Sequence, residues 1–137
     1  MGGVRVEEEV EVAADRVWEL VRDFGGIQRW SAGVDGVEVE GEGIGAVRTI
    51  KTAGIELQER LEAIDDAARS FSYAIISGPV PVQNYYATLT VHEAGEDRSR
   101  ITWESTFEPQ GASEEDCANL FRGVYQAGIA GVRTTLG

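Results

Sequence analysis

Residues 113–132 read SEEDCANLFRGVYQAGIAGV. The opening Ser-Glu-Glu-Asp is typical of a helix N-terminus, where a serine side chain can accept a hydrogen bond from an unpaired backbone N–H group. Apolar or small residues then recur at helical spacing and define one broad face, made of Cys117, Leu120, Phe121, Val124, Tyr125, Gly128 and Val132. The stretch is therefore predicted to form one long terminal helix.

The sequence before this helix indicates a series of β-strands. Alternating segments are bounded by Gly, Pro, Asp or Asn, and six of them lie at Val37–Glu40, Gly45–Thr52, Glu56–Ile64, Ser70–Ser77, Tyr85–His92 and Arg100–Phe107. Because most of the connections are short turns, we expect the strands to pair antiparallel. A seventh strand is predicted at Val4–Val12, where valines alternate with charged residues.

Two short helices are predicted between the first strand and the second. Val17, Leu20, Val21 and Phe24 recur at helical spacing, and Gly25-Gly26 ends that helix before a segment that carries Trp30. The order of elements is then strand, two short helices, six strands and a long helix. This order predicts an α+β protein of the helix-grip type, one domain over residues 1–137, in which a curved sheet wraps around the terminal helix.

The predicted terminal helix carries several residues with small or no side chains, namely Gly123, Ala127, Ala130 and Gly131. Side chains of this size need not fill the space between helix and sheet. We therefore expect an internal cavity of roughly 300 to 1,000 Å³ that opens near Trp30, Gly54-Ile55 and Pro79-Val80.

Composition excludes several classes of function. The 137 residues carry 24 acidic and 12 basic side chains, a net charge of −12, which disfavours nucleic acid and anionic membranes as partners. Cys117 and His92 are the single cysteine and histidine, so neither a disulfide nor a Cys/His metal site is expected, although a carboxylate metal site stays open. No long apolar segment or signal-peptide pattern is found, which predicts a cytoplasmic protein without membrane insertion. No nucleotide-binding fingerprint occurs either, and we expect no cofactor.

Strand parity predicts which side chains point toward the helix. The inward phase contains two ionisable groups, Arg48 and Glu59, on neighbouring strands. A buried, unpaired carboxylate is costly and its protonated form is favoured, which makes Glu59 the best candidate for a general acid or base. The alternative is a structural ion pair between Glu59 and Arg48. The two interpretations are compatible, because a paired arginine can still orient a ligand carbonyl.

The remaining candidates are apolar or aromatic. Tyr85, with Arg48 and Glu59, is predicted to take part in proton transfer. The hydroxyls of Tyr85 and Tyr73 are expected on the buried side of adjacent strands. The residues predicted to contact a ligand are Trp30, Ile50, Tyr73, Ile75, Ala87, Trp103, Phe107, Phe121 and Tyr125. Taken singly, aromatic residues such as Trp30, Trp103, Phe107, Phe121 and Tyr125 are more often ordinary core residues, and only their collection around sheet and helix favours a cavity.

Strand parity also predicts the direction of three further titratable side chains, those of Glu104, Glu8 and His92. Glu104 is predicted to point outward, because the opposite phase would expose both Trp103 and Phe107. Glu8 falls on the inward phase of the first strand, which favours a bulge or an edge position there. His92 closes its strand on the outward phase and is expected to be solvated.

Several segments resemble the START-related superfamily often labelled SRPBCC. This superfamily includes bacterial polyketide cyclase/dehydrase-like proteins, pollen-allergen-like ligand carriers and plant abscisic acid receptors. The similar segments are Gly45-Ala46-Val47-Arg48, Glu59 to Asp66, Asn84-Tyr85 and Thr90 to Glu93, which look like the receptors' central strands, whereas Ala14 to Trp18 and Trp30 look more like the bacterial branch.

The resemblance implies the helix-grip fold and a ligand pocket. Glu59 and Tyr85 match receptor positions that line the pocket and hold water-mediated contacts to the ligand. The receptors' ligand-pairing lysine is replaced near Ser31, the gate-like Gly54 to Leu57 lacks the Leu-Pro-Ala tip, and Pro79-Val80-Pro81-Val82 stands where the latch has His and Arg. These departures argue against hormone sensing with a phosphatase partner.

Two hypotheses of function follow, and fold alone does not choose between them. The first is a cofactor-independent enzyme of the cyclase, aromatase or dehydratase type, in which Glu59, Arg48 and Tyr85 move protons. The second is a carrier or sensor of a hydrophobic or aromatic small molecule without chemistry, as a monomer or homodimer. A protein-interaction module like the co-chaperone members is disfavoured by the charged outer faces.

Overall fold

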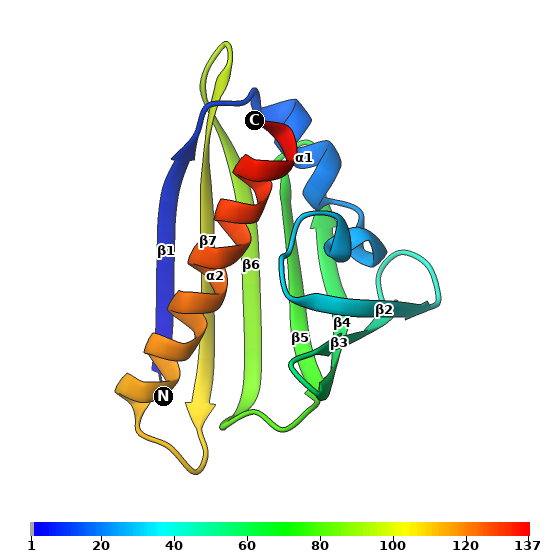
Figure 1. The fold of residues 1–137 in the computed structure, drawn as a ribbon, viewed down its shortest axis with the longest axis vertical. Helices are drawn as coiled ribbons and strands as arrows, with labels where there is room; N and C mark the ends of the chain where they lie inside the picture. Colours follow the sequence, from blue (N-terminus) through cyan, green and yellow to red (C-terminus); the bar gives the residue numbers. More distant parts are fainter. Residues whose placement is uncertain (1) are drawn as a thin grey trace.

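The computed structural model describes residues 2–137 and contains a seven-stranded antiparallel sheet. Along the sheet the strands lie in the order β1-β7-β6-β5-β4-β3-β2, so β2 to β7 form a meander and β1 pairs with β7 at one edge (Figure 1). The strands are β1 (Gly2–Val10), β2 (Val34–Glu40), β3 (Val47–Thr52), β4 (Ile55–Asp65), β5 (Ser70–Ser77), β6 (Val82–Gly95) and β7 (Arg98–Pro109). The predicted helix-grip fold is confirmed.

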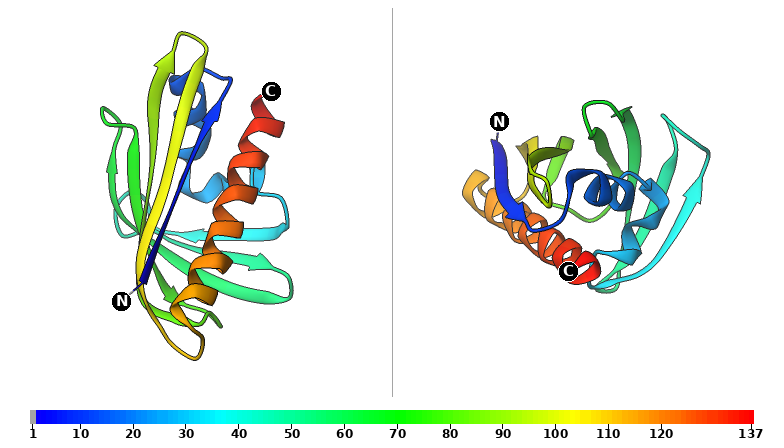
Figure 2. Two further views of the ribbon diagram at one scale, coloured as in Figure 1. Left: turned by 90° about the vertical axis from the view of Figure 1, so that its left-hand side faces the viewer. Right: turned by 90° about the horizontal axis from the view of Figure 1, so that it is seen from above.

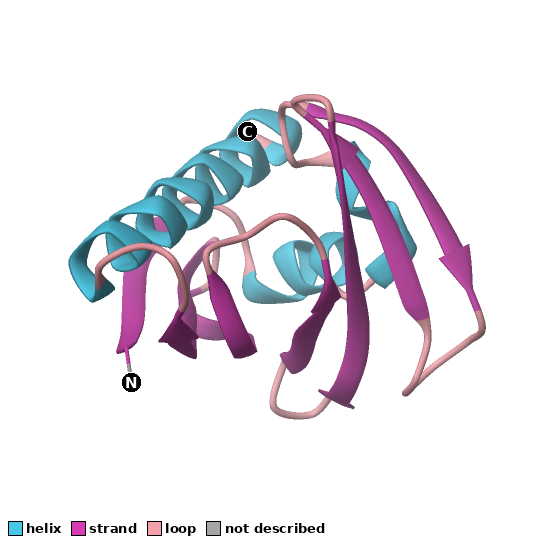
Figure 3. Ribbon diagram, turned by 90° about the horizontal axis from the view of Figure 1, so that it is seen from below, coloured by secondary structure: helices cyan, strands magenta, loops and turns pink. Residues whose placement is uncertain are grey.

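Three helices accompany the sheet: α1 (Ala14–Val21), the 3₁₀-helix η1 (Phe24–Arg29) and α2 (Glu114–Leu136). Ser113 caps α2 as predicted, because its Oγ accepts a hydrogen bond from the Asp116 backbone N–H at 3.0 Å. Figures 2 and 3 show α2 lying across the concave side of the curved sheet, with α1 and η1 closing one end. None of the helices in residues 2–137 has both the length and the apolar character that a membrane crossing requires.

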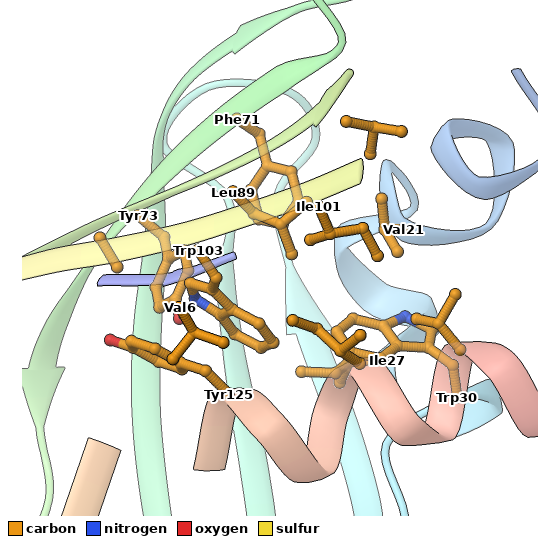
Figure 4. Packing of buried hydrophobic residues seen from close by; sticks show 14 of the residues in the cluster. Val6, Val21, Ile27, Trp30, Phe71, Tyr73, Leu89, Ile101, Trp103 and Tyr125 are labelled. Atoms are coloured by element: carbon orange, nitrogen blue, oxygen red, sulfur yellow. Dashed lines mark hydrogen bonds between the residues drawn. The ribbon is translucent and has the colours of Figure 1, made fainter. Parts of the chain in front are cut away.

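Aromatic packing joins α2 to the middle of the sheet. Trp103 of β7 stacks on Tyr125 of α2 with ring centroids 4.5 Å apart, and Trp30, just after η1, meets Trp103 edge-on at 5.9 Å. Figure 4 shows Trp103 and Tyr125 side by side with Ile27 and Trp30 nearby. Offset and edge-on ring contacts of this kind add to the stabilisation from buried area. The core is thus continuous from the sheet through α2 to η1.

Two predictions about α2 need correction. Leu120 and Val124, assigned to its buried face, are 46% and 49% exposed, because no sheet residue covers this part of the helix. Gly131 was expected to leave open space, yet a Cβ at this position would lie 1.8 Å from the backbone oxygen of Trp30. Gly131 therefore permits close contact between α2 and the end of η1.

The predicted directions of Glu104, Glu8 and His92 can be compared with their positions in the structure. Glu104 is exposed, as predicted, and its carboxylate lies 3.7 Å from the Arg5 guanidinium. Of the two alternatives for Glu8, the edge position is confirmed, since β1 is an edge strand that pairs with β7 without a bulge, and Glu8 forms a 2.9 Å ion pair with Arg133 of α2. His92 points outward yet is half-buried, because its Nε2 lies 3.0 Å from the Thr102 hydroxyl.

Candidate functional site

A cavity of about 410 Å³ lies between the concave face of the sheet and α2. Its volume falls within the predicted range and within the range usual for small-molecule sites. Exposed or half-buried residues, most of them apolar, form the mouth: Ile55 at the start of β4, Pro79 and Val80 before β6, and Leu120 and Val124 on α2, together with the half-buried Ser31 and Thr52. Hollows elsewhere on the surface are shallower and more open to solvent.

Arg48 and Glu59 form a buried ion pair in the cavity wall. They face each other across β3 and β4, and the Arg48 Nε and Nη2 atoms lie 2.9 and 2.7 Å from Glu59 Oε1. Arg48 Nη1 donates to the Phe24 backbone oxygen at 2.9 Å, and its guanidinium lies 3.9 Å from the centre of the Phe24 ring. Arg48 Nε donates a hydrogen bond to Glu59 Oε1, and the shorter Nη2 ion-pair contact reaches the same oxygen, whereas Glu59 Oε2 forms no hydrogen bond with a side chain in residues 2–137.

Three tyrosine hydroxyls and one indole N–H lie together at the inner end of the cavity. They belong to Tyr73, Tyr85, Tyr125 and Trp103. Trp103 Nε1 donates to the Tyr73 hydroxyl at 3.1 Å, the Tyr73 and Tyr85 hydroxyls lie 3.5 Å apart, and the Tyr85 and Tyr125 hydroxyls are hydrogen-bonded. We call this set the hydroxyl cluster.

The hydroxyl cluster is uncharged at ordinary pH. Desolvation by burial raises the pKa of Tyr73 and Tyr85 well above its ordinary value, and the nearby Glu59 charge raises that of Tyr73 further. Burial also raises the pKa of the Tyr125 hydroxyl. These groups therefore act as neutral hydrogen-bond donors and acceptors.

Most of the predicted site residues line this cavity. Glu59, Arg48 and Tyr85 are there, and so are the predicted contact residues Ile50, Tyr73, Ile75, Trp103, Phe121 and Tyr125. Whether they bind a ligand or catalyse a reaction stays a prediction.

Three predicted contact residues lie outside the lining. Trp30 packs behind Trp103, and Phe107 is fully buried behind Phe121 with ring centroids 5.5 Å apart. Ala87 points inward but is fully covered. Each of them belongs to the core next to the cavity.

Sequence reasoning missed part of the wall. Ile27 of η1, with Ala32 and Val34 after it, contributes lining that strand parity does not address, because Ile27 and Ala32 lie between β1 and β2. Ala127 also lines the cavity, and the signal in the sequence is its small size, which leaves space between helix and sheet.

Comparison with known proteins places the fold and the cavity in context. The chain is 31% identical over 100 residues to abscisic acid receptor PYL6 of Arabidopsis thaliana, an alignment that covers 67% of this chain and 46% of the receptor. The chain thus spans about half the length of that relative.

Solved structures agree with the fold. The protein XoxI from Bacillus cereus superposes with a TM-score of 0.92 at 30% identity, covering 99% of this chain and 96% of that one. Norcoclaurine synthase from Thalictrum flavum superposes with a TM-score of 0.78 at 19% identity, covering 96% and 84%, a likeness of fold alone.

The family assignment rests on the whole sequence. Residues 1–137 match the family described as polyketide cyclase / dehydrase and lipid transport. The sheet that curves around α2, the cavity and the partial identity to the receptor agree with that match. This chain belongs to the polyketide cyclase / dehydrase and lipid transport family.

Proposed function

We propose that this protein binds a small, largely apolar organic molecule in the cavity beneath α2. The observation that carries the proposal is the partly enclosed, mostly apolar space of about 410 Å³ with a few polar groups converging at one end. Such a combination is the usual design of a small-molecule site, in which apolar walls supply affinity and a few polar atoms fix orientation. The family and the receptor relative support this class of ligand.

The arrangement of polar groups suggests how the molecule lies. The mouth is apolar at Ile55, Val80, Leu120 and Val124, whereas the hydroxyl cluster and the ion pair lie deeper. An apolar body would occupy the outer part of the cavity, and a polar substituent would reach the buried groups.

Filling the cavity should abolish binding. Ile75 of β5 lines the cavity opposite Glu59, so Ile75→Trp places an indole ring in the ligand's space. We expect this change to weaken binding of the neutral, environment-sensitive naphthyl-ketone dye prodan by about tenfold or more, as measured by its fluorescence.

The next residue along the same strand provides a matched control. Ile76 is 41% exposed and does not line the cavity, so Ile76→Trp adds the same side chain outside. Its dye binding should match that of the wild type. Equal loss in both variants, or in neither, would contradict binding in this cavity.

A second candidate function is acid–base catalysis on the bound molecule. The observation that favours it is Glu59 Oε2, which lacks a hydrogen-bonding side chain in the described residues and belongs to a carboxylate in the cavity wall. A carboxylate held by Arg48 through one oxygen keeps the other oxygen for a substrate proton. The hydroxyl cluster could then stabilise an enolate, as neutral donors do in other acyl and enol chemistries.

Hydrogen exchange tests this candidate without knowledge of the natural substrate. Acetylnaphthalene has exchangeable protons next to its carbonyl, and loss of its methyl signal in D₂O can be followed by NMR. We expect the protein to accelerate this exchange and Glu59→Gln to reduce the acceleration by about a hundredfold, because the amide cannot accept the proton. Tyr85→Phe should give a smaller loss.

The opposite result would indicate a carrier. If acetylnaphthalene binds and its exchange rate stays at the uncatalysed value, Glu59 provides polarity without moving a proton. The binding proposal would then stand alone.

A further inference from the structure

We infer that the cavity selects an uncharged ligand that carries a hydrogen-bond acceptor such as a carbonyl group, and that it excludes carboxylates. This inference deepens the binding function proposed above and rests on it. Three features of the cavity carry it: the state of its cation, the composition of its mouth and the hydrogen-bond balance of the hydroxyl cluster.

The first feature is that the charge of Arg48 is already compensated. Arg48 is the one cationic residue among the lining residues, and Glu59 is the one anionic residue. Two guanidinium nitrogens of Arg48 contact Glu59 and the third contacts the Phe24 backbone oxygen. A ligand carboxylate would have to share this guanidinium with a buried carboxylate of the same sign, which is strongly unfavourable at low dielectric.

The second feature is that the lining described within residues 2–137 contains no cation besides Arg48 to compensate an incoming anion. The mouth residues Ile55, Pro79, Val80, Leu120 and Val124 are apolar, and the half-buried polar residues of the outer lining, Ser31 and Thr52, are uncharged. The sequence also carries a net charge of −12, which repels anions at long range. An anionic ligand would therefore lose its hydration without gaining a partner.

The third feature is an excess of donors in the hydroxyl cluster. Three hydrogen bonds link Trp103, Tyr73, Tyr85 and Tyr125, but one indole N–H and three O–H groups supply four hydrogens. Trp103 can only donate, so one O–H remains whichever way the tyrosines are oriented. If the hydroxyls donate toward Tyr125, the remaining hydrogen belongs to Tyr125, where the Ser105 hydroxyl is a second neighbouring acceptor, and in the reverse direction it belongs to Tyr73. If Tyr85 accepts from both neighbours, the remaining hydrogen belongs to Tyr85, which also lines the cavity.

That remaining hydrogen defines the polar group of the ligand. Both Tyr73 and Tyr125 line the cavity, so the donor is within reach of a bound molecule. A neutral ketone, aldehyde, ester or amide accepts such a hydrogen bond at no cost in charge. The ligand class is thus a small, mostly apolar carbonyl compound without an ionised group.

Two compounds of nearly equal shape test this selection on the unmodified protein. Acetylnaphthalene and naphthoate, substituted at the same ring position, have nearly the same shape. The carbonyl carbon carries a methyl group in the ketone and a negatively charged oxygen in the carboxylate. In displacement of bound prodan at neutral pH and moderate salt, we expect the ketone to bind about thirtyfold more tightly than the carboxylate or better.

The variant Glu59→Gln tests the cause of the selection. The substitution keeps the shape of the side chain but leaves Arg48 with an uncompensated positive charge. We expect the ratio of the two dissociation constants to fall by about tenfold or more, because naphthoate now neutralises the arginine. Circular dichroism verifies that the variant is folded. If the variant does not fold, the comparison of ketone and carboxylate binding to the wild-type protein tests the inference by itself.

The outcomes separate this inference from the function on which it rests. Prodan binding with equal affinities for ketone and carboxylate overturns the inference and leaves the binding function in place. Failure of acetylnaphthalene to displace prodan also counts against the inference. Absence of prodan binding to the wild-type protein overturns both.

Discussion

Arg48→Met is expected to lower the free energy of unfolding by about 3 to 5 kcal/mol. The guanidinium is 2% exposed and holds Glu59, whose side chain is 7% exposed, so removing it leaves a carboxylate without its counter-ion in the cavity wall. It also removes the donor to the Phe24 backbone oxygen, which ties β3 to η1. Urea denaturation followed by tryptophan fluorescence measures the loss.

The double variant Arg48→Met/Glu59→Met provides the control. Replacing a whole buried ion pair by apolar residues of similar volume is often neutral or stabilising. We therefore expect the double variant to recover most of the stability that the single variant loses. If the single substitution costs less than about 1 kcal/mol, Glu59 does not depend on Arg48 and the cavity wall is better solvated than its burial indicates.

Gly131→Ala is expected to destabilise the protein by about 3 kcal/mol or more, near the upper end for overpacking. The added Cβ would lie 1.8 Å from the backbone oxygen of Trp30, and neither backbone can yield without moving a whole element. The helix would have to move away from η1 and from the Trp30–Trp103 contact. Thermal unfolding monitored by circular dichroism measures this effect.

Gly123→Ala on the same helix should stabilise the protein, an effect opposite in sign to that of Gly131→Ala. A Cβ at Gly123 meets nothing within 4 Å, so the substitution adds no clash. Replacing a glycine inside an exposed helix by alanine typically stabilises by about 0.5 to 1 kcal/mol. Stabilisation by both changes would show that α2 and η1 are not in close contact.

The strands were predictable because one face of the sheet is buried. In β7 the alternation of Trp103 and Phe107 with outward residues gives the correct phase without any knowledge of the fold. The beginning of β6 is less predictable. Asn84 reads as a turn residue, and its φ of 53° fits that reading, but β6 continues through it as an irregularity in the pairing with β7.

The site could be predicted in part for the same reason. Parity places Arg48, Glu59 and Tyr85 on the concave face, and all three line the cavity. Parity does not indicate how far α2 lies from each point of that face. Phe107 therefore satisfies the pattern and still belongs to the packed core, because Phe121 of α2 covers it.

The pairing of β1 with β7 determines when the cavity can form. Gly2 lies opposite Phe107 and Val10 opposite Ser99, so the partner of the first strand is synthesised only after five other strands. The hairpins from β2 to β7 are local and can assemble as the chain emerges, whereas β1 must wait with Val4, Val6 and Val10 unpaired. The helix α2 packs against β1 and comes later still. We therefore expect the docking of β1 and α2 to be the slow, non-local step of folding, and because α2 lines the cavity, a molecule that binds there would favour completion of this step by mass action.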